Sequence, residues 1–175
     1  MGKLDIVTDE SGNKVVLLPE IIFSNKQNIN WDDVEDYLGK YVGELIEIAE
    51  TRDIIYIGNK FPDEYGGSSY TRKTKGARAK AKANAAQGIR EMVEIATDKV
   101  YRENHKEKHS EDAHNGWFYY VTRFAIPLYN NEKKTGEYNV YSACLVVNHA
   151  ANGKMYLYDV VDIKKEASNP LKTNK

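Results

Sequence analysis

The chain has 175 residues, of which 41% are hydrophobic and 13 are tyrosine, and its formal net charge is −1. This composition predicts one folded domain over residues 1–175 and favours an ordered over a disordered chain, because buried aromatic residues can offset the entropy cost of folding. No apolar run reaches the length of a membrane span, and residues 1–10 lack the apolar core of a signal peptide. We therefore expect a cytoplasmic protein without a membrane partner.

The first half of the chain predicts short strands, one long helix and a loop. Residues 5–18 are expected to form two short strands around a Ser-Gly-Asn turn. Over residues 31–50, apolar side chains recur every three or four positions, which predicts an amphipathic helix with Asn30 as its N-cap. Residues 53–58 are expected to form a strand, and the residues from 59 to 75, which contain Gly66-Gly67-Ser68-Ser69, a surface loop.

The second half predicts further helices and then strands. A helix rich in Ala, Lys and Arg is expected from residue 77 to about 96, broken or capped at Gly88, followed by a polar helix over residues 98–113. Residues 117–129, 138–149 and 154–164 are rich in aromatic and β-branched residues and are separated by turns, which predicts two successive hairpins. The fold class predicted from this order is α+β, with N-terminal helices packed on a C-terminal antiparallel sheet.

Alternation along the predicted strands assigns their two faces. In the first strand, the predicted core face carries Phe118, Tyr120, Thr122, Phe124, Ile126 and Leu128. The opposite face carries Trp117, Tyr119, Val121, Arg123 and Ala125. In the last strand, Met155, Leu157, Val161 and Ile163 are expected to face the core. Asp159 also falls on the core side, which is costly unless the carboxylate is paired or a bulge displaces it.

Charge is distributed unevenly along the chain. Residues 1–64 carry 6 Lys/Arg and 14 Asp/Glu, whereas residues 65–90 carry 7 Lys/Arg and no acid. Such a block could neutralise several phosphates, and aromatic residues on the open sheet face could stack unpaired bases. The alternative is an ordinary solvated surface helix. The predicted nucleic-acid contacts are Arg72, Lys73, Lys75, Arg78 and Lys80, and the predicted aromatic contacts are Trp117, Tyr119, Tyr156 and Tyr158.

Three histidines form a second candidate site. His105 and His109 are four residues apart and would share one face of a helix, with His114 nearby. They could bind a metal with Glu111 or Asp112, act as general acid or base, or simply belong to a polar helix. No CxxC or HExxH pattern is present, and we expect no metal and no cofactor.

Arg123 stands alone among apolar strand residues, on the face opposite the core. It could stabilise charge on a phosphate, or pair with Asp162 or with an acid of the early helix. The single cysteine, Cys144, lies in an apolar strand and is expected to be a core residue. Because GxGxxG, GxxxxGK[ST] and GxSxG are all absent, the usual phosphate-binding loops and serine-hydrolase sites have no support.

Several separated motifs occur in a familiar order: DIIYIGNKFPDEY, KAKANAAQGI, EKH…DA…GWFYYVTRFAIP and KMYLYDVVDIKKE. Over residues 17–171 this order resembles the large polyvalent protein associated domain, type three, which also occurs at the C-terminus of some phage head-morphogenesis proteins. That domain is similar to the barnase/EndoU/colicin/RelE group of nucleases. The resemblance implies a nuclease-like domain with N-terminal helices on an antiparallel sheet of about four strands, and an active cleft on the open sheet face.

The resemblance also implies a function, a metal-independent RNase from a bacterial mobile element or phage, acting as a toxin or effector. A base would remove the 2′-hydroxyl proton, an acid would protonate the leaving 5′-oxygen, and cations would hold the phosphorane. By their place in the motifs, His109 would be general acid or base, Arg123 and Lys82 would bind phosphate, and Tyr119 would be a substrate platform. The identity of the base stays open between His105 and Tyr119.

Other functions remain open at this point. The expected partner is RNA, and a toxin would also need a protein inhibitor of the immunity type. The alternative function is a non-catalytic mobile-element module that binds nucleic acid or inhibits a host defence protein. A third alternative is an assembly or docking module within a larger phage polypeptide.

Overall fold

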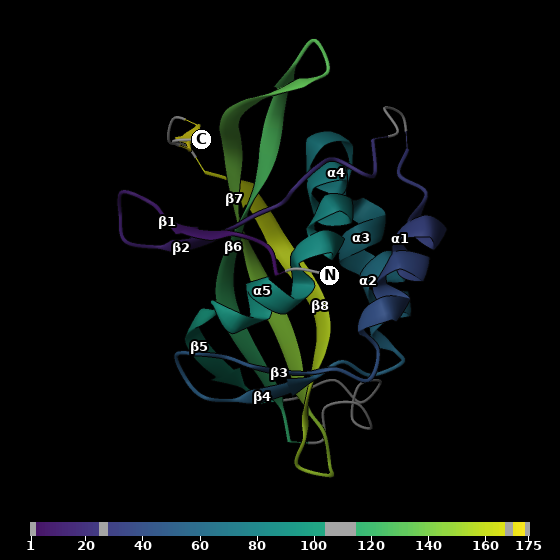
Figure 1. Cartoon of the computed structure of the whole chain (residues 1–175). Coiled ribbons are helices and arrows are strands. Elements are labelled where there is room, and N and C mark those ends of the chain that lie inside the picture. The colour runs from purple at the N-terminus through teal and green to yellow at the C-terminus, as the bar shows by residue number, and fades with distance from the viewer. Residues whose placement is uncertain (1–2, 25–27, 104–114, 167–169, 174–175) are drawn as a thin grey trace.

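A computed structural model describes residues 3–24, 28–103, 115–166 and 170–173. Its described strands form one sheet with the order β1-β2-β6-β7-β8-β4-β3, while β5 also pairs with β6 and β9 with β7 (Figure 1). The strands are β1 (Ile6–Thr8), β2 (Lys14–Leu17), β3 (Leu45–Glu47), β4 (Ile54–Tyr56), β5 (Thr97–Arg102), β6 (Trp117–Asn130), β7 (Lys133–His149), β8 (Met155–Lys165) and β9 (Leu171–Lys172).

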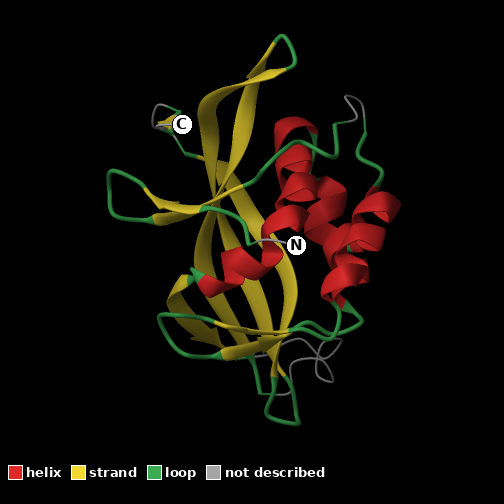
Figure 2. Cartoon of the chain, viewed as in Figure 1, coloured by secondary structure: helices red, strands yellow, loops and turns green. Residues whose placement is uncertain are grey.

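The helices lie together on one side of the curled sheet (Figure 2). They are α1 (Trp31–Leu38), α2 (Phe61–Gly67), α3 (Ser69–Lys73), α4 (Gly76–Ala85) and α5 (Ile89–Glu94), with 3-10 turns at Gly39–Tyr41 and Ala86–Gly88. In the described part of the chain, no helix is both long and apolar enough to cross a membrane.

The predicted architecture, N-terminal helices on an antiparallel sheet of about four strands, is wrong. Strand residues make up 41% of the described residues and helical residues 27%, and the sheet curls into a half-barrel. β6 and β7 are long enough that each pairs with more than two strands. β6 pairs with β2, β5 and β7, and β7 pairs with β6, β8 and β9. The N-terminal segments join this sheet through two parallel pairings, β2 with β6 and β4 with β8. Such long-range pairings leave no trace in local periodicity, which is why the sequence underestimates the sheet.

The two predicted hairpins are confirmed as the antiparallel meander β6-β7-β8. The predicted core face of β6 is also confirmed, because Tyr120, Thr122 and Phe124 are at most 1% exposed. This inner face packs against buried residues of α1, α4 and α5. The outer face is less open than alternation predicts, since Ala125 and Trp117 are buried in two smaller apolar clusters.

Three local predictions are wrong. The helix expected over residues 31–50 begins at Trp31 with the predicted Asn30 cap, but it ends at Leu38 and the chain continues into β3. The loop expected over residues 59–75 contains α2 and α3, because Pro62 suits a first helical turn and Ser68 caps the next helix. The helix expected from residue 98 is replaced by β5 as far as Arg102, and residues 104–114 lie outside the described chain.

Asp159 is buried on the core side of β8, and both predicted remedies are present. Its carboxylate pairs with Lys82, and the register of β8 against β7 shifts between Val146 and Val147. The shift changes the alternation, so Val160 faces the core where Val161 was expected. Beyond Tyr156, the edge of β8 lies against helices. Tyr70 of α3 accepts a hydrogen bond from the Ile163 amide at 2.9 Å, which blocks a free strand edge.

One contact between helices predicts a pH-dependent stability. Glu35 of α1 packs so closely against Gly66 of α2 that a Cβ atom at position 66 would clash with the Glu35 carboxylate. Burial, a hydrogen bond with Asp63 and the neighbouring acids raise the pKa of Glu35 from 4.5 to about 7. Folding therefore binds a proton between these two values, and stability falls as the pH rises from 4.5 through about 7.

Replacing Glu35 with glutamine should remove this loss, because the amide cannot ionise. We expect Glu35→Gln to be more stable than wild type at pH 8 and to show a flatter dependence of the urea midpoint on pH between 5 and 8. Asp33→Asn, on the same helix but exposed to solvent, is the matched control and should retain the wild-type slope. Equal slopes for Glu35→Gln and wild type would contradict the assignment.

Candidate nucleic-acid interface

The predicted basic residues lie on α3, on α4 and in the turn between them. We call Arg72, Lys73, Lys75, Arg78 and Lys80 the basic surface. The first four are exposed and Lys80 is half-buried. Within the described residues, no carboxylate forms an ion pair with any of the five. The surface is therefore a local excess of positive charge.

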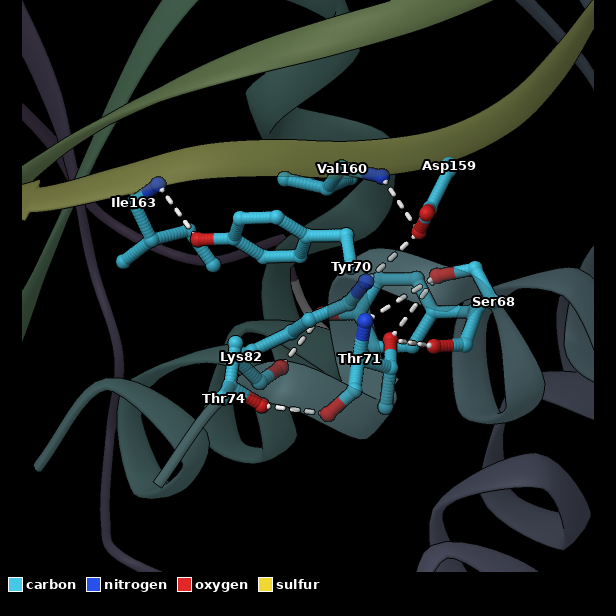
Figure 3. A network of polar contacts seen from close by, with 9 residues as sticks. Ser68, Tyr70, Thr71, Thr74, Lys82, Asp159, Val160 and Ile163 are labelled. Carbon is cyan, nitrogen blue, oxygen red and sulfur yellow. Dashed lines mark hydrogen bonds and ion pairs between the residues drawn. The ribbon is translucent and has the colours of Figure 1, made fainter. Parts of the chain in front are cut away.

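Short-range hydrogen bonds give the basic surface its shape (Figure 3). The Ser68 hydroxyl accepts from the Thr71 amide at 3.2 Å and begins α3. The Thr71 hydroxyl donates to the Tyr65 carbonyl at 2.6 Å, and the Thr74 hydroxyl donates to the Thr71 carbonyl at 2.7 Å. Gly76, with φ of +58°, then turns the chain into α4. Serine and threonine thus fix the two helices that carry the cations.

Beneath the basic surface lies a buried ion pair between α4 and β8. The Lys82 ammonium is 2.6 Å from the Asp159 carboxylate, and their side chains are 0% and 5% exposed. The rings of Tyr65 and Tyr70 lie 4.6 and 5.0 Å from the same ammonium. Burial lowers the pKa of Lys82 and raises that of Asp159, and the attraction between the two charges opposes both shifts. This pair and its aromatic neighbours attach α4 to the edge of the sheet (Figure 3).

The Lys82 ammonium is therefore enclosed and already paired. A phosphate could reach it only by replacing Asp159 and separating α4 from β8, so its contacts favour a structural role over the phosphate-binding role that the resemblance implies. Asn84, in the same motif, also makes structural contacts. Its Oδ1 accepts from the amides of Ile22 and Phe23, and its Nδ2 donates to the Phe23 carbonyl.

Tyr119 and Arg123 both lie on the outer face of the sheet. They are four residues apart on β6, so their side chains point to the same side. The guanidinium carbon of Arg102, on β5, lies 5.6 Å from the Tyr119 ring centre. Trp117 and Tyr158 meet edge to face at 4.9 Å on the same face. Trp117 is buried, so the groups of this face that could stack on unpaired bases are the Tyr119 and Tyr158 rings and the Arg102 guanidinium.

β5 owes its position partly to a network around Asp53. This carboxylate accepts from Lys99 of β5 at 2.8 Å and from the buried Tyr120 hydroxyl at 2.7 Å. Burial alone would raise the pKa of Asp53, but hydrogen bonds from Lys99, Tyr120 and Thr51 lower it overall. The network holds the strand that brings Arg102 to Tyr119.

The structure bears differently on the roles predicted for Tyr119 and Arg123. Burial raises the pKa of Tyr119, which opposes its use as a general base. Its role as a substrate platform stays a prediction. Arg123 Nε donates to Glu166 at 3.0 Å, a partner that differs from the two acids considered from sequence. Its phosphate role also stays a prediction.

The predicted catalytic residues are not brought together within the described chain. Lys82 lies on the helical side of the sheet and Arg123 on the outer face. His105, His109 and His114 lie outside the described residues. Among the residues that the structure does describe, no group of three His, Cys, Asp or Glu side chains could hold a metal ion.

Sequence reasoning missed a cavity of about 250 Å³ between α2 and the ends of β7 and β8. Asn148 and Glu64 line it, together with Tyr156 and Tyr158. The residues come from segments far apart in the chain, so no motif marks the cavity. The only local signal is Asn148 itself, an amide within an apolar strand.

No protein-family model, curated protein or solved structure matches this chain.

Proposed function

We propose that this domain binds single-stranded RNA and that the basic surface holds the phosphates of the strand. The observation that carries the proposal is the set of exposed cations on α3 and α4 without a carboxylate partner in the described residues. Unneutralised cations bind nucleic acid by releasing the counterions condensed on its phosphates. In an ordinary solvated helix, acids usually alternate with bases, whereas here residues 65–90 contain none.

The outer face favours RNA with unpaired bases over duplex DNA. The Tyr119 ring and the Arg102 guanidinium lie against each other, and Trp117 packs on Tyr158. Aromatic rings and guanidinium planes stack unpaired bases with little sequence preference. Because the basic surface lies on the helical side of the sheet and this face on the other (Figure 2), we assign phosphates to the basic surface and the unpaired bases of other nucleotides in the same strand to this face.

The proposal places the domain in the cytoplasm of a bacterial host or target cell, where RNA is accessible. Two protein partners stay predictions: an inhibitor of the immunity type and a host defence protein. Neither is needed for RNA binding.

Metal-independent RNA cleavage is a second candidate function. It is favoured by Arg123, because within the described residues its Nε donates to Glu166 and its other N–H donors would suit a phosphate. In this candidate, His109 acts as general acid or base and Arg123 stabilises the charge of the transition state.

One experiment separates the two functions. Wild type and His109→Ala are incubated with total bacterial RNA and with tRNA in EDTA, and binding and cleavage are measured on the same samples. We expect both proteins to bind RNA with similar affinity and to leave it intact. Cleavage that leaves 2′,3′-cyclic phosphate ends and is lost in His109→Ala would establish the RNase instead. Absence of both binding and cleavage would overturn both functions.

A further inference from the structure

The cavity beside α2 lies where two strands separate. β4 pairs with β8 only at Ile55–Met155 and Tyr56–Tyr156, and the chain then turns through Gly58 toward α2. A cavity of about 250 Å³ remains between α2 and the ends of β7 and β8. This volume lies just below the roughly 300 Å³ at which pockets for drug-sized ligands begin, so it suits one small ring system.

One of the residues that line this cavity carries a buried acceptor. Asn148 is 8% exposed, and among the described residues its Oδ1 has no hydrogen-bond partner. Buried side-chain oxygens are nearly always paired, because leaving one unpaired is costly. A ligand that brings an N–H donor would remove this cost.

The other walls define the shape and charge of the ligand. Phe61, Tyr156 and Tyr158 supply aromatic surface, which favours a planar group. The Glu64 carboxylate adds a second acceptor, so the ligand should carry donors. Tyr158 packs against Trp117 as well, so the cavity continues the outer face of the sheet.

We propose that this cavity binds a nucleobase that carries an exocyclic amine, adenine or cytosine. In these bases the amine lies beside a ring nitrogen that accepts a hydrogen bond. The Asn148 amide can therefore accept from the amine and donate to the ring nitrogen, as asparagine does with adenine in nucleic-acid complexes. The inference rests on the proposed RNA binding, because the base would belong to the bound strand. It does not depend on the basic surface and is tested without phosphates.

The test compares nucleosides in which a carbonyl oxygen replaces the exocyclic amine, a change that also turns the adjacent Watson–Crick ring nitrogen from an acceptor into a donor. Adenosine and inosine, and cytidine and uridine, are titrated into the whole protein and followed by amide chemical shifts. We expect adenosine and cytidine to bind at least about tenfold more tightly than inosine and uridine, the effect of one lost buried hydrogen bond. Asn148→Leu should abolish this preference. Asn139→Leu, the same substitution on the same strand but away from the cavity, should retain it.

Equal affinity for all four nucleosides, or no binding of any, would overturn the inference. Neither result would decide whether the basic surface binds RNA, because that binding is measured separately. If Asn148→Leu fails to fold, the comparison of adenosine with inosine on the wild-type protein still decides whether the cavity recognises the amine. Competition between adenosine and oligoadenylate would identify an RNA base as the ligand, and adenosine binding without competition would identify a free nucleoside. Both outcomes support a pocket that recognises the amine.

Discussion

Replacing Arg72, Lys73 and Arg78 together with alanine is expected to weaken RNA binding roughly 10- to 100-fold at about 0.15 M salt. Each cation that contacts a phosphate of a single strand contributes about 0.7 to the slope of log affinity against log salt. The triple variant should therefore lose about 2 from that slope. The measurement is fluorescence anisotropy of a labelled oligonucleotide between about 0.05 M and about 0.2 M salt, a range over which wild type should lose about 100-fold in affinity.

The control removes the same charge elsewhere. Lys14, Lys133 and Lys134 are exposed and lie outside the basic surface, so their triple alanine variant should bind with nearly wild-type affinity and slope. Equal losses in the two variants would show that net charge alone attracts RNA. In that case the basic surface would have no special role.

Breaking the buried ion pair has the largest expected effect on stability. Lys82→Met leaves the Asp159 carboxylate buried without its cation, and such a change costs about 3–5 kcal/mol. Replacing both residues, in Lys82→Met/Asp159→Leu, removes the unpaired charge and should recover most of that loss. Urea unfolding followed by circular dichroism measures the three free energies of unfolding.

The same variants distinguish a structural lysine from a catalytic one. If Lys82 bound phosphate, Lys82→Met would retain its stability and lose activity toward RNA. We expect the opposite, a large loss of stability in the single variant and RNA binding retained by the double variant. A single variant as stable as wild type would contradict the buried pair between α4 and β8.

Local patterns in the sequence predicted local structure well. The cap at Asn30 and the hairpins of the last third depend on residues near each other in the chain, and both are confirmed. The inner face of β6 follows from alternation alone, as the burial of Tyr120 and Phe124 shows. Asp159 is instructive, because its cost on the core side was evident from sequence although its partner was not.

The errors arose where distant segments compete with local preference. Residues 45–47 continue a helical pattern, but pairing with β4 makes them a strand. Lys82 and its neighbours formed one basic block in the sequence, yet helix geometry turns Lys82 inward to Asp159 while Arg78 stays exposed. Composition cannot show which cation of a block is buried.

The sequence by itself determined the single basic block, the meander of long strands and the two-sided pattern of β6, because charge, turn residues and alternation are local properties. Only the tertiary structure decided the curled nine-stranded sheet of the described residues, the partner of Asp159 and the cavity at Asn148. Parallel pairings, a buried ion pair and a cavity all join residues far apart in the chain. Their free energy depends on packing between segments, which no single segment of sequence specifies.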